Sequence, residues 1–289
     1  MKGKVYINGD LLPADEASIS VYDRGFQYGD GIFEGLRCYN GKIFKLKEHV
    51  QRLFQSARAI QMQIPLSHDE MCEAIKTTVR ANASLNAHIK PIVTRGYGWK
   101  LGLDPHNTTE ANIVIIVREI GESMYAQADK GLRLAVVSLR KPPPYCLDPR
   151  VKSLNYLLNI LARAEAQASG ADEALLLDTQ GYLAEGSADN IFLVREKMVY
   201  TPTLQSALAG ITRQTVIDMA VASSIKVFEQ SLTQYDLYNA DEAFVTGSGA
   251  GIASVVQVDG RLVGDGKPGP ITQRLIQRYA EVVKEGEPV

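Results

Sequence analysis

A stretch without regularly spaced apolar residues divides the chain into two parts. Residues 119–131 lose the periodic apolar side chains that are present on both sides of them. A chain of 289 residues is long for one domain and can bury a core in each of two. We therefore expect an N-terminal domain over residues 1–118, an interdomain loop over 119–131 and a C-terminal domain over 132–289.

The N-terminal part combines tight turns with helices. Asn8-Gly9 and Asn40-Gly41 each lie between apolar runs, and a type I′ hairpin turn needs positive φ at both central residues. Ser67 and Glu70 have the spacing of a capping box at the start of a helix. Helical spacing covers 46–60 and 67–83, and buried strands are expected at 89–94 and 112–117. This part is predicted to be α+β with antiparallel strands.

The C-terminal part also mixes strands and helices. Strands are expected at 132–139, 173–177, 191–194, 225–228 and 243–246, and helices at 153–168, at 211–223 and from 270 onward. The predicted fold class is therefore α+β (mixed α/β) in both domains.

Composition excludes several classes of function. The net charge is −2, with both signs interspersed, so we expect no nucleic-acid partner. No run approaches the roughly 18 apolar residues of a membrane helix, so we expect no membrane partner. The cysteines, Cys38, Cys72 and Cys146, are odd in number and lack metal-ligand spacing, and the histidines are scattered. We expect a cytoplasmic protein without a metal site.

Two residues suggest cofactor chemistry. Lys152 precedes an apolar-periodic segment, and Glu185 lies in Gly-Tyr-Leu-Ala-Glu-Gly-Ser-Ala-Asp-Asn. A buried lysine amine near cations can act as a nucleophile, and a carboxylate can keep a cofactor's ring nitrogen protonated. Taken alone, Lys152 is better explained as a solvated residue in the first turn of a helix, and Glu185 as a turn cap.

Three segments could bind an anion. Arg52 carries a guanidinium fork. Ala209–Arg213, with Ile211 and Thr212, precedes a predicted helix whose first N–H groups would be unpaired. The glycine-rich run 246–251, with Ser248, Gly249 and Ala250, follows a predicted strand and can form a backbone nest. Singly, each also fits an ordinary role: a solvated charge, a helix cap or a loop.

Lys152, Glu185 and the three possible anion-binding segments, taken in their order along the chain, resemble the fold type IV pyridoxal-phosphate aminotransferases. The resemblance is strongest to the branched-chain amino acid aminotransferase group. Arg24–Arg37, in which Phe33, Gly35 and Arg37 stand at the places typical of the branched-chain enzymes, strengthens the resemblance. It extends from about Tyr6 to Tyr279.

The resemblance implies a two-domain homodimer or higher homo-oligomer with pyridoxal 5′-phosphate between the domains, and a ping-pong reaction in which the catalytic Lys152 forms a Schiff base. The implied cofactor-binding residues are Arg52, Lys152, Tyr156, Glu185, Ile211, Thr212 and Ser248. Tyr156 is expected one helical turn after Lys152, on the same face. The implied substrate-binding residues are Tyr28, Phe33, Arg37, His88, Lys90, Tyr97, Tyr125, Gly249 and Ala250. Core packing is an alternative for Tyr28 and Phe33.

The expected activity is transamination of branched-chain L-amino acids (leucine, isoleucine and valine) with 2-oxoglutarate, as in branched-chain amino acid biosynthesis. The chain has His88-Ile89-Lys90-Pro91 where this group usually has Tyr-Ile-Arg-Pro, and histidine and lysine differ from tyrosine and arginine in carboxylate binding. A D-amino acid or (R)-amine transaminase of the same fold is therefore an alternative. Aminodeoxychorismate lyase and a scaffold protein without catalysis are further ones.

Overall fold

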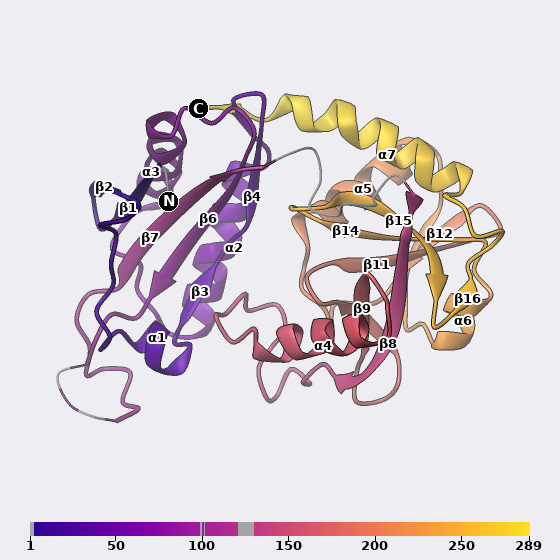
Figure 1. Cartoon of the computed structure of the whole chain (residues 1–289), viewed down its shortest axis with the longest axis horizontal. Coiled ribbons are helices and arrows are strands. Elements are labelled where there is room, and N and C mark those ends of the chain that lie inside the picture. Colours follow the sequence, from indigo (N-terminus) through magenta and orange to yellow (C-terminus); the bar gives the residue numbers. More distant parts are fainter. Residues whose placement is uncertain (1–2, 99, 101, 121–129) are drawn as a thin grey trace. The chain divides into compact units, whose positions relative to one another are not determined.

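The computed structural model describes residues 3–98, 100, 102–120 and 130–289 (Figure 1). By their contacts, the residues form two compact units. Unit 1 comprises Met1–Glu122, Val151–Asn155 and Val283–Val289, and unit 2 comprises Ser123–Arg150 and Tyr156–Val282. This division differs from the expected one, because the segment that contains Lys152 groups with the N-terminal residues. Most of the expected interdomain loop lies outside the described residues.

Unit 1 is built on an antiparallel sheet. Its strand order is β17-β5-β4-β6-β7-β1-β2, and β3 also pairs with β6. The strands are β1 (Lys4–Ile7), β2 (Asp10–Pro13), β3 (Gly31–Phe33), β4 (Leu36–Tyr39), β5 (Lys42–Ile43), β6 (Ala87–Thr94), β7 (Asn112–Glu119) and β17 (Glu287–Pro288). Asn8-Gly9 and Asn40-Gly41 have positive φ and join β1 to β2 and β4 to β5, which confirms the predicted turns.

The helices of unit 1 are α1 (Arg24–Tyr28), α2 (Leu46–Ala59) and α3 (His68–Ala81). The longer two pack on each other and on the sheet. In α2, apolar spacing places Leu46, Val50 and Leu53 in the core of unit 1. The predicted capping box starts α3, since the Ser67 hydroxyl accepts from Glu70 N while the Glu70 carboxylate accepts from Ser67 N.

Unit 2 is built on a mixed sheet of order β10-β9-β8-β15-β14-β11-β12-β13, with β16 pairing with β15. Its strands are β8 (Leu132–Arg140), β9 (Glu173–Leu177), β10 (Leu183–Gly186), β11 (Asn190–Arg195), β12 (Met198–Thr201), β13 (Val227–Glu229), β14 (Glu242–Gly247), β15 (Gly251–Val258) and β16 (Arg261–Leu262). Strand β8 runs parallel to both of its neighbours, β9 and β15. The expected mixture of strands and helices is thus present in both units.

The helices of unit 2 are α4 (Leu157–Ala168), α5 (Ile211–Ala222), α6 (Gln234–Tyr238) and α7 (Pro270–Val282), and a 3-10 turn at Val283–Glu285 follows in unit 1. Helix α4 packs on β8 and β9, whereas α5 and α7 pack on each other and on β14 (Figure 1). Helix α4 begins at Leu157 and not near residue 153 as expected. The reason is that the preceding backbone pairs with β3: Leu154 N donates to Gly31 O at 2.9 Å.

The start of α7 is capped by a side chain from another element. Glu242 of β14 is buried, and its two carboxylate oxygens accept from Ile271 N at 3.0 Å and Thr272 N at 2.7 Å. Both N–H groups belong to the first turn of α7, where a helix lacks internal acceptors. The carboxylate also suits the positive end of the helix dipole.

We predict that Glu242→Ala lowers the free energy of unfolding of unit 2 by about 2 kcal/mol, because two backbone donors lose a charged acceptor. Urea denaturation measures the loss, and faster amide exchange at the start of α7 localises it. Glu242→Gln keeps one acceptor and should lose less. Equal stability of wild type and Glu242→Ala would show that water replaces the cap at no cost.

Candidate active site

The backbone around Lys152 is held as a strand-like segment of unit 1. Phe33 N donates to Lys152 O at 2.9 Å, and Lys152 N donates to Ser56 Oγ at 3.2 Å. The side chain is half-buried, and its Nζ lies 4.5 Å from the centre of the Phe33 ring. The alternative of a solvated lysine in the first turn of a helix is therefore wrong.

Gly31 permits this pairing. A Cβ at Gly31 would lie 2.6 Å from Leu154 Cδ1 and 2.8 Å from Val93 O. Any larger residue would therefore push apart β3 and the segment that carries Lys152.

A second ammonium group lies against the same aromatic ring. Lys90 Nζ is 4.6 Å from the centre of the Phe33 ring. Burial lowers the pKa of Lys90, and the positive charges of Lys152 and Arg118 lower it further. The half-buried ring of Phe33 thus has two ammonium groups as neighbours, an arrangement that suits a site for anionic molecules.

His88 lies beside this pair on β6. Burial lowers its pKa to about 4, and the nearby charges of Lys90, Arg37, Lys152 and Arg118 act in the same direction. The imidazole is therefore neutral near pH 7. Gly35 leaves room for it, because a Cβ there would lie 3.2 Å from His88 Nε2.

Arg52 belongs to a buried cluster that sequence reasoning missed. Its Nε donates to Glu34 Oε1 at 2.6 Å and its Nη2 to Glu34 Oε2 at 2.8 Å, and His49 Nδ1 lies 2.8 Å from Glu34 Oε2. Burial alone would raise the pKa of Glu34, but the charges and hydrogen bonds of Arg52 and His49 hold that pKa well below its usual range. Burial lowers the pKa of His49.

The cluster fixes the direction of the Arg52 guanidinium. Arg52 is 7% exposed, so the alternative of a solvated surface charge is wrong. A guanidinium has five N–H donors, and the paired bonds to Glu34 use two of them. The available signal was a carboxylate inside Gly-Ile-Phe-Glu-Gly-Leu, an otherwise apolar run that needed a cationic partner.

In unit 2, Glu185 is a buried carboxylate with two partners. Its Oε1 lies 2.7 Å from Lys141 Nζ, and its Oε2 accepts from Leu208 N at 2.8 Å. Both charged side chains are 9% exposed. Lys141 was not among the predicted site residues, because the three prolines after it indicated only an extended segment.

Asn190 binds the backbone carbonyl of Leu208. Its Nδ2 donates to Leu208 O at 3.0 Å, so the N–H and the carbonyl of Leu208 are bound by Glu185 and Asn190. Helix α5 then begins at Ile211, with Gly210 at its N-cap. A Cβ at Gly210 would lie 2.0 Å from Asn190 Oδ1. The first turn of α5, with buried Thr212, is thus held in a defined place and offers N–H groups to an anion.

The glycine-rich segment is the turn between β14 and β15, and Ser248, Gly249 and Ala250 are half-buried in it. Asp189 lies against its start, since a Cβ at Gly247 would be 2.2 Å from Asp189 Oδ1. Residues 185–190 therefore contact both the segment before α5 and the glycine-rich turn.

The remaining predicted residues lie in several places. Tyr28, at the end of α1, is 41% exposed, so core packing is the wrong interpretation for it. Tyr97 is 42% exposed and lines a hollow of unit 1. Tyr156 immediately precedes α4, and because residues 152–155 are not helical, its expected position one helical turn after Lys152 is wrong. Tyr125 lies outside the described residues.

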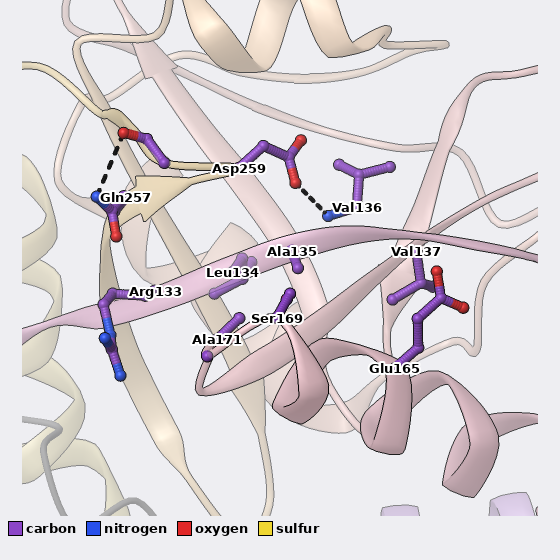
Figure 2. A pocket seen from close by; sticks show the side chains of 12 residues that line it. Arg133, Leu134, Ala135, Val136, Val137, Glu165, Ser169, Ala171, Gln257 and Asp259 are labelled. Atoms are coloured by element: carbon purple, nitrogen blue, oxygen red, sulfur yellow. Dashed lines mark hydrogen bonds between the residues drawn. The ribbon is translucent and has the colours of Figure 1, made fainter.

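Another hollow, of about 360 Å³, lies in unit 2 over β8 and the end of α4 (Figure 2). None of the predicted site residues lines it. Asp259 at its edge accepts from Val136 N at 2.8 Å, and Glu165 accepts from Ser138 N at 2.6 Å. These two carboxylates therefore bind the backbone of β8.

The described residues contain neither a cluster of metal ligands nor a helix that could span a membrane. No group of three or more histidine, cysteine, aspartate or glutamate side chains within them could hold a metal ion. No helix in the same part of the chain has the length and apolar character needed to cross a membrane.

We predict that stability falls as the pH is lowered from 7 to 5, and that His88→Asn reduces this fall. The pKa of His88 is about 4 in the folded protein and ordinarily 6.5, so between these values the unfolded chain binds a proton that the folded chain does not. Urea midpoints at the two pH values measure the effect. His106→Asn, at an exposed site, is the control and should keep the full fall. The same fall in His88→Asn as in wild type would contradict the burial argument.

Comparison with known proteins identifies the family. The model of the family described as amino-transferase class IV matches residues 31–258. The branched-chain-amino-acid aminotransferase of Pseudomonas aeruginosa is 37% identical over 97% of this chain and 93% of its own length. The branched-chain aminotransferase from the thermophilic archaeon Thermoproteus uzoniensis, whose crystal structure was solved with norvaline, has a TM-score of 0.92 and 36% identity, covering 99% of this chain and 96% of that one. The Escherichia coli branched-chain enzyme has a TM-score of 0.94 and 33% identity, covering 99% and 97%. The match to the family model and the similarity to these relatives over nearly the whole chain show that the protein belongs to the class IV aminotransferases.

Proposed function

We propose that the protein transfers amino groups between branched-chain L-amino acids (leucine, isoleucine and valine) and 2-oxoglutarate with pyridoxal 5′-phosphate as cofactor. The observation that carries the proposal is the placement of Lys152. Two backbone hydrogen bonds fix it, and its amine lies against Phe33 beside the second amine of Lys90. The relatives named above, which are branched-chain aminotransferases, support the substrate class.

The residues present fit this cofactor. A phosphate dianion suits the first turn of α5 with Ile211 and Thr212, the turn with Ser248, and the guanidinium of Arg52. Gly210 and Gly247 have no room for a side chain, so the backbone of these segments lies close to Asn190 and Asp189. Buried Glu185, with Lys141 beside it, is the carboxylate proposed for the ring nitrogen, and Tyr156 is proposed to donate to the ring hydroxyl.

The bound cofactor would withdraw electrons from the carbon next to the substrate's amine. Lys152 is the proposed acid–base group, and its Nζ would remove the proton from that carbon and deliver it to a carbon of the cofactor. The strand-like backbone at Lys152 limits the movement of the side chain to its own torsions. Arg37, buried on β4, and Lys90 are proposed to bind carboxylates, and the Phe33 ring to bind the branched side chain. Tyr28, His88, Tyr97, Tyr125, Gly249 and Ala250 stay proposed as substrate contacts.

A transaminase of D-amino acids or (R)-amines is the second candidate. It is favoured by one observation, the neutral His88 beside Lys90, at places where the branched-chain group usually has tyrosine and arginine. Both candidates use Lys152 in the same way, so the amino donor decides between them.

We also propose a homodimer or higher homo-oligomer located in the cytoplasm. Leu157, Ile160 and Leu161 of α4 are 67%, 62% and 49% exposed and share one face of the helix. An exposed apolar stripe of this kind is typical of a subunit contact. The three cysteines are free thiols, which suits a reducing compartment.

Half-reactions of the pyridoxal-phosphate-loaded enzyme test the activity. The visible absorbance of the cofactor should decrease rapidly with L-leucine or L-glutamate, and slowly with D-alanine or (R)-1-phenylethylamine. Lys152→Ala should lose turnover by several orders of magnitude because the proton carrier is gone, whereas the exposed Lys226→Ala should equal wild type. Rapid reaction with D-alanine or the amine alone would establish the second candidate, and turnover by Lys152→Ala would refute both.

Ile160→Glu should lower the molar mass of the protein in solution to that of a smaller assembly, because burying the new charge at a subunit contact is unfavourable. Light scattering after size-exclusion chromatography measures the mass. Val221→Glu on α5 is the matched control, since Val221 is 61% exposed and belongs to a different helix. A wild-type monomer, or an unchanged assembly in Ile160→Glu, would contradict the proposed contact.

A further inference from the structure

A row of basic side chains crosses the sheet of unit 1. Arg37 of β4 is opposite His88 of β6, and His88 is in turn opposite Arg118 of β7. The alternate residues of these strands, including Leu36, Ile89 and Val117, pack in or against the core of unit 1. The basic row therefore lies on the face of the sheet away from that core.

Such a row is unfavourable for folding. Arg37 and Arg118 place two positive charges on the same face of the sheet, on either side of the neutral His88, and like charges on one face repel. Lys90, two residues along β6 from His88, adds a further positive charge on the same face. The row is thus expected to serve a ligand and not the stability of the sheet.

The neighbours of the row are also positive. Within the described residues, the charged groups that lower the pKa of Lys90 are Lys152 and Arg118. For His88 they are Lys90 on its own strand, Arg37 on β4, Lys152 on the adjoining segment and Arg118 on β7. No carboxylate is among these groups, so the charges that act on His88 and Lys90 from the described residues are all positive.

The row lies farther from Lys152 than Lys90 does. Phe33, whose ring contacts both ammonium groups, is opposite Ile92 on β6. Along this face of β6 the order is therefore Ile92, Lys90 and His88. Each step of two residues advances about 7 Å along a strand. Lys90 is placed for an anionic group near the reacting amine, and the row for one farther along the substrate.

We propose that Arg118, with Arg37 and His88, forms an outer anion subsite that selects amino and oxo acids whose second carboxylate is farther from the reacting carbon than that of glutamate. The inference rests on the proposed function and extends its substrate class to longer dicarboxylic acids. Arg118 is exposed and able to meet the outer carboxylate, to which a guanidinium can donate two parallel hydrogen bonds. His88 becomes a better donor there, because a carboxylate beside it favours the charged imidazolium.

Three oxo acids as acceptors from L-leucine test the proposal: 2-oxoadipate, 2-oxoglutarate and 4-methyl-2-oxopentanoate, the last followed by isotope exchange. Arg118→Gln should lower kcat/KM about tenfold for 2-oxoadipate, at most about threefold for 2-oxoglutarate, and not at all for the monocarboxylate. Arg58→Gln, on the exposed side of α2, is the charge-matched control and should change none of them. Lys90→Gln should affect 2-oxoglutarate more than Arg118→Gln does.

Binding of unreactive adipate to the loaded enzyme gives a readout apart from turnover. Calorimetry in two buffers of different ionisation enthalpy should show proton uptake in wild type and its loss in His88→Gln. Turnover of leucine and 2-oxoglutarate with no use of 2-oxoadipate, or an equal effect of Arg118→Gln on all acceptors, would overturn the outer subsite alone. Absence of leucine transamination would instead overturn the proposed function, and the subsite with it.

Discussion

The pairing of the Lys152 backbone with β3 is the interaction on which the site of unit 1 depends. The lysine is held by hydrogen bonds of its own peptide groups and of Leu154, so its Cα is fixed while its side chain stays able to turn. The same strand supplies Phe33, against which the amine lies, and leads directly into Glu34, which orients Arg52. A lysine in the first turn of a helix would have had no such connection to the other groups.

Charge is distributed unequally in unit 1. Directly after β3, Glu34 is bound by Arg52 and His49, so the positive and negative groups of that cluster are closely matched. On the face with Lys152, Lys90 and His88, the charged groups that lower the pKa values of His88 and Lys90 are all cations. The difference separates the cluster in which Glu34 orients Arg52 from a face whose charged groups are cations and which we propose as a place for an anion.

Features that depend on neighbouring residues were predictable from the sequence. The Asn8-Gly9 and Asn40-Gly41 turns, the capping box at Ser67 and the start of α5 beside Gly210 follow from local backbone preferences. Features that join distant residues were not. The bond between Phe33 and Lys152, the pair of Lys141 with Glu185 and the cluster around Glu34 link positions that no local pattern relates. The start of α4 was misplaced for the same reason, because pairing with β3 overrides helical preference in residues 152–155.

Leu208 connects the Glu185 carboxylate with the start of α5 in unit 2. Its N–H is bound to Glu185 and its carbonyl to Asn190, and the chain then reaches the N-cap of α5 two residues after Leu208. Any shift of the Glu185 carboxylate therefore moves the peptide that leads to the N-terminal end of α5. In the proposed site, anion affinity at α5 and the electronic effect of Glu185 would therefore be coupled through Leu208, and the effects of changes at Glu185 and Asn190 are not expected to add independently.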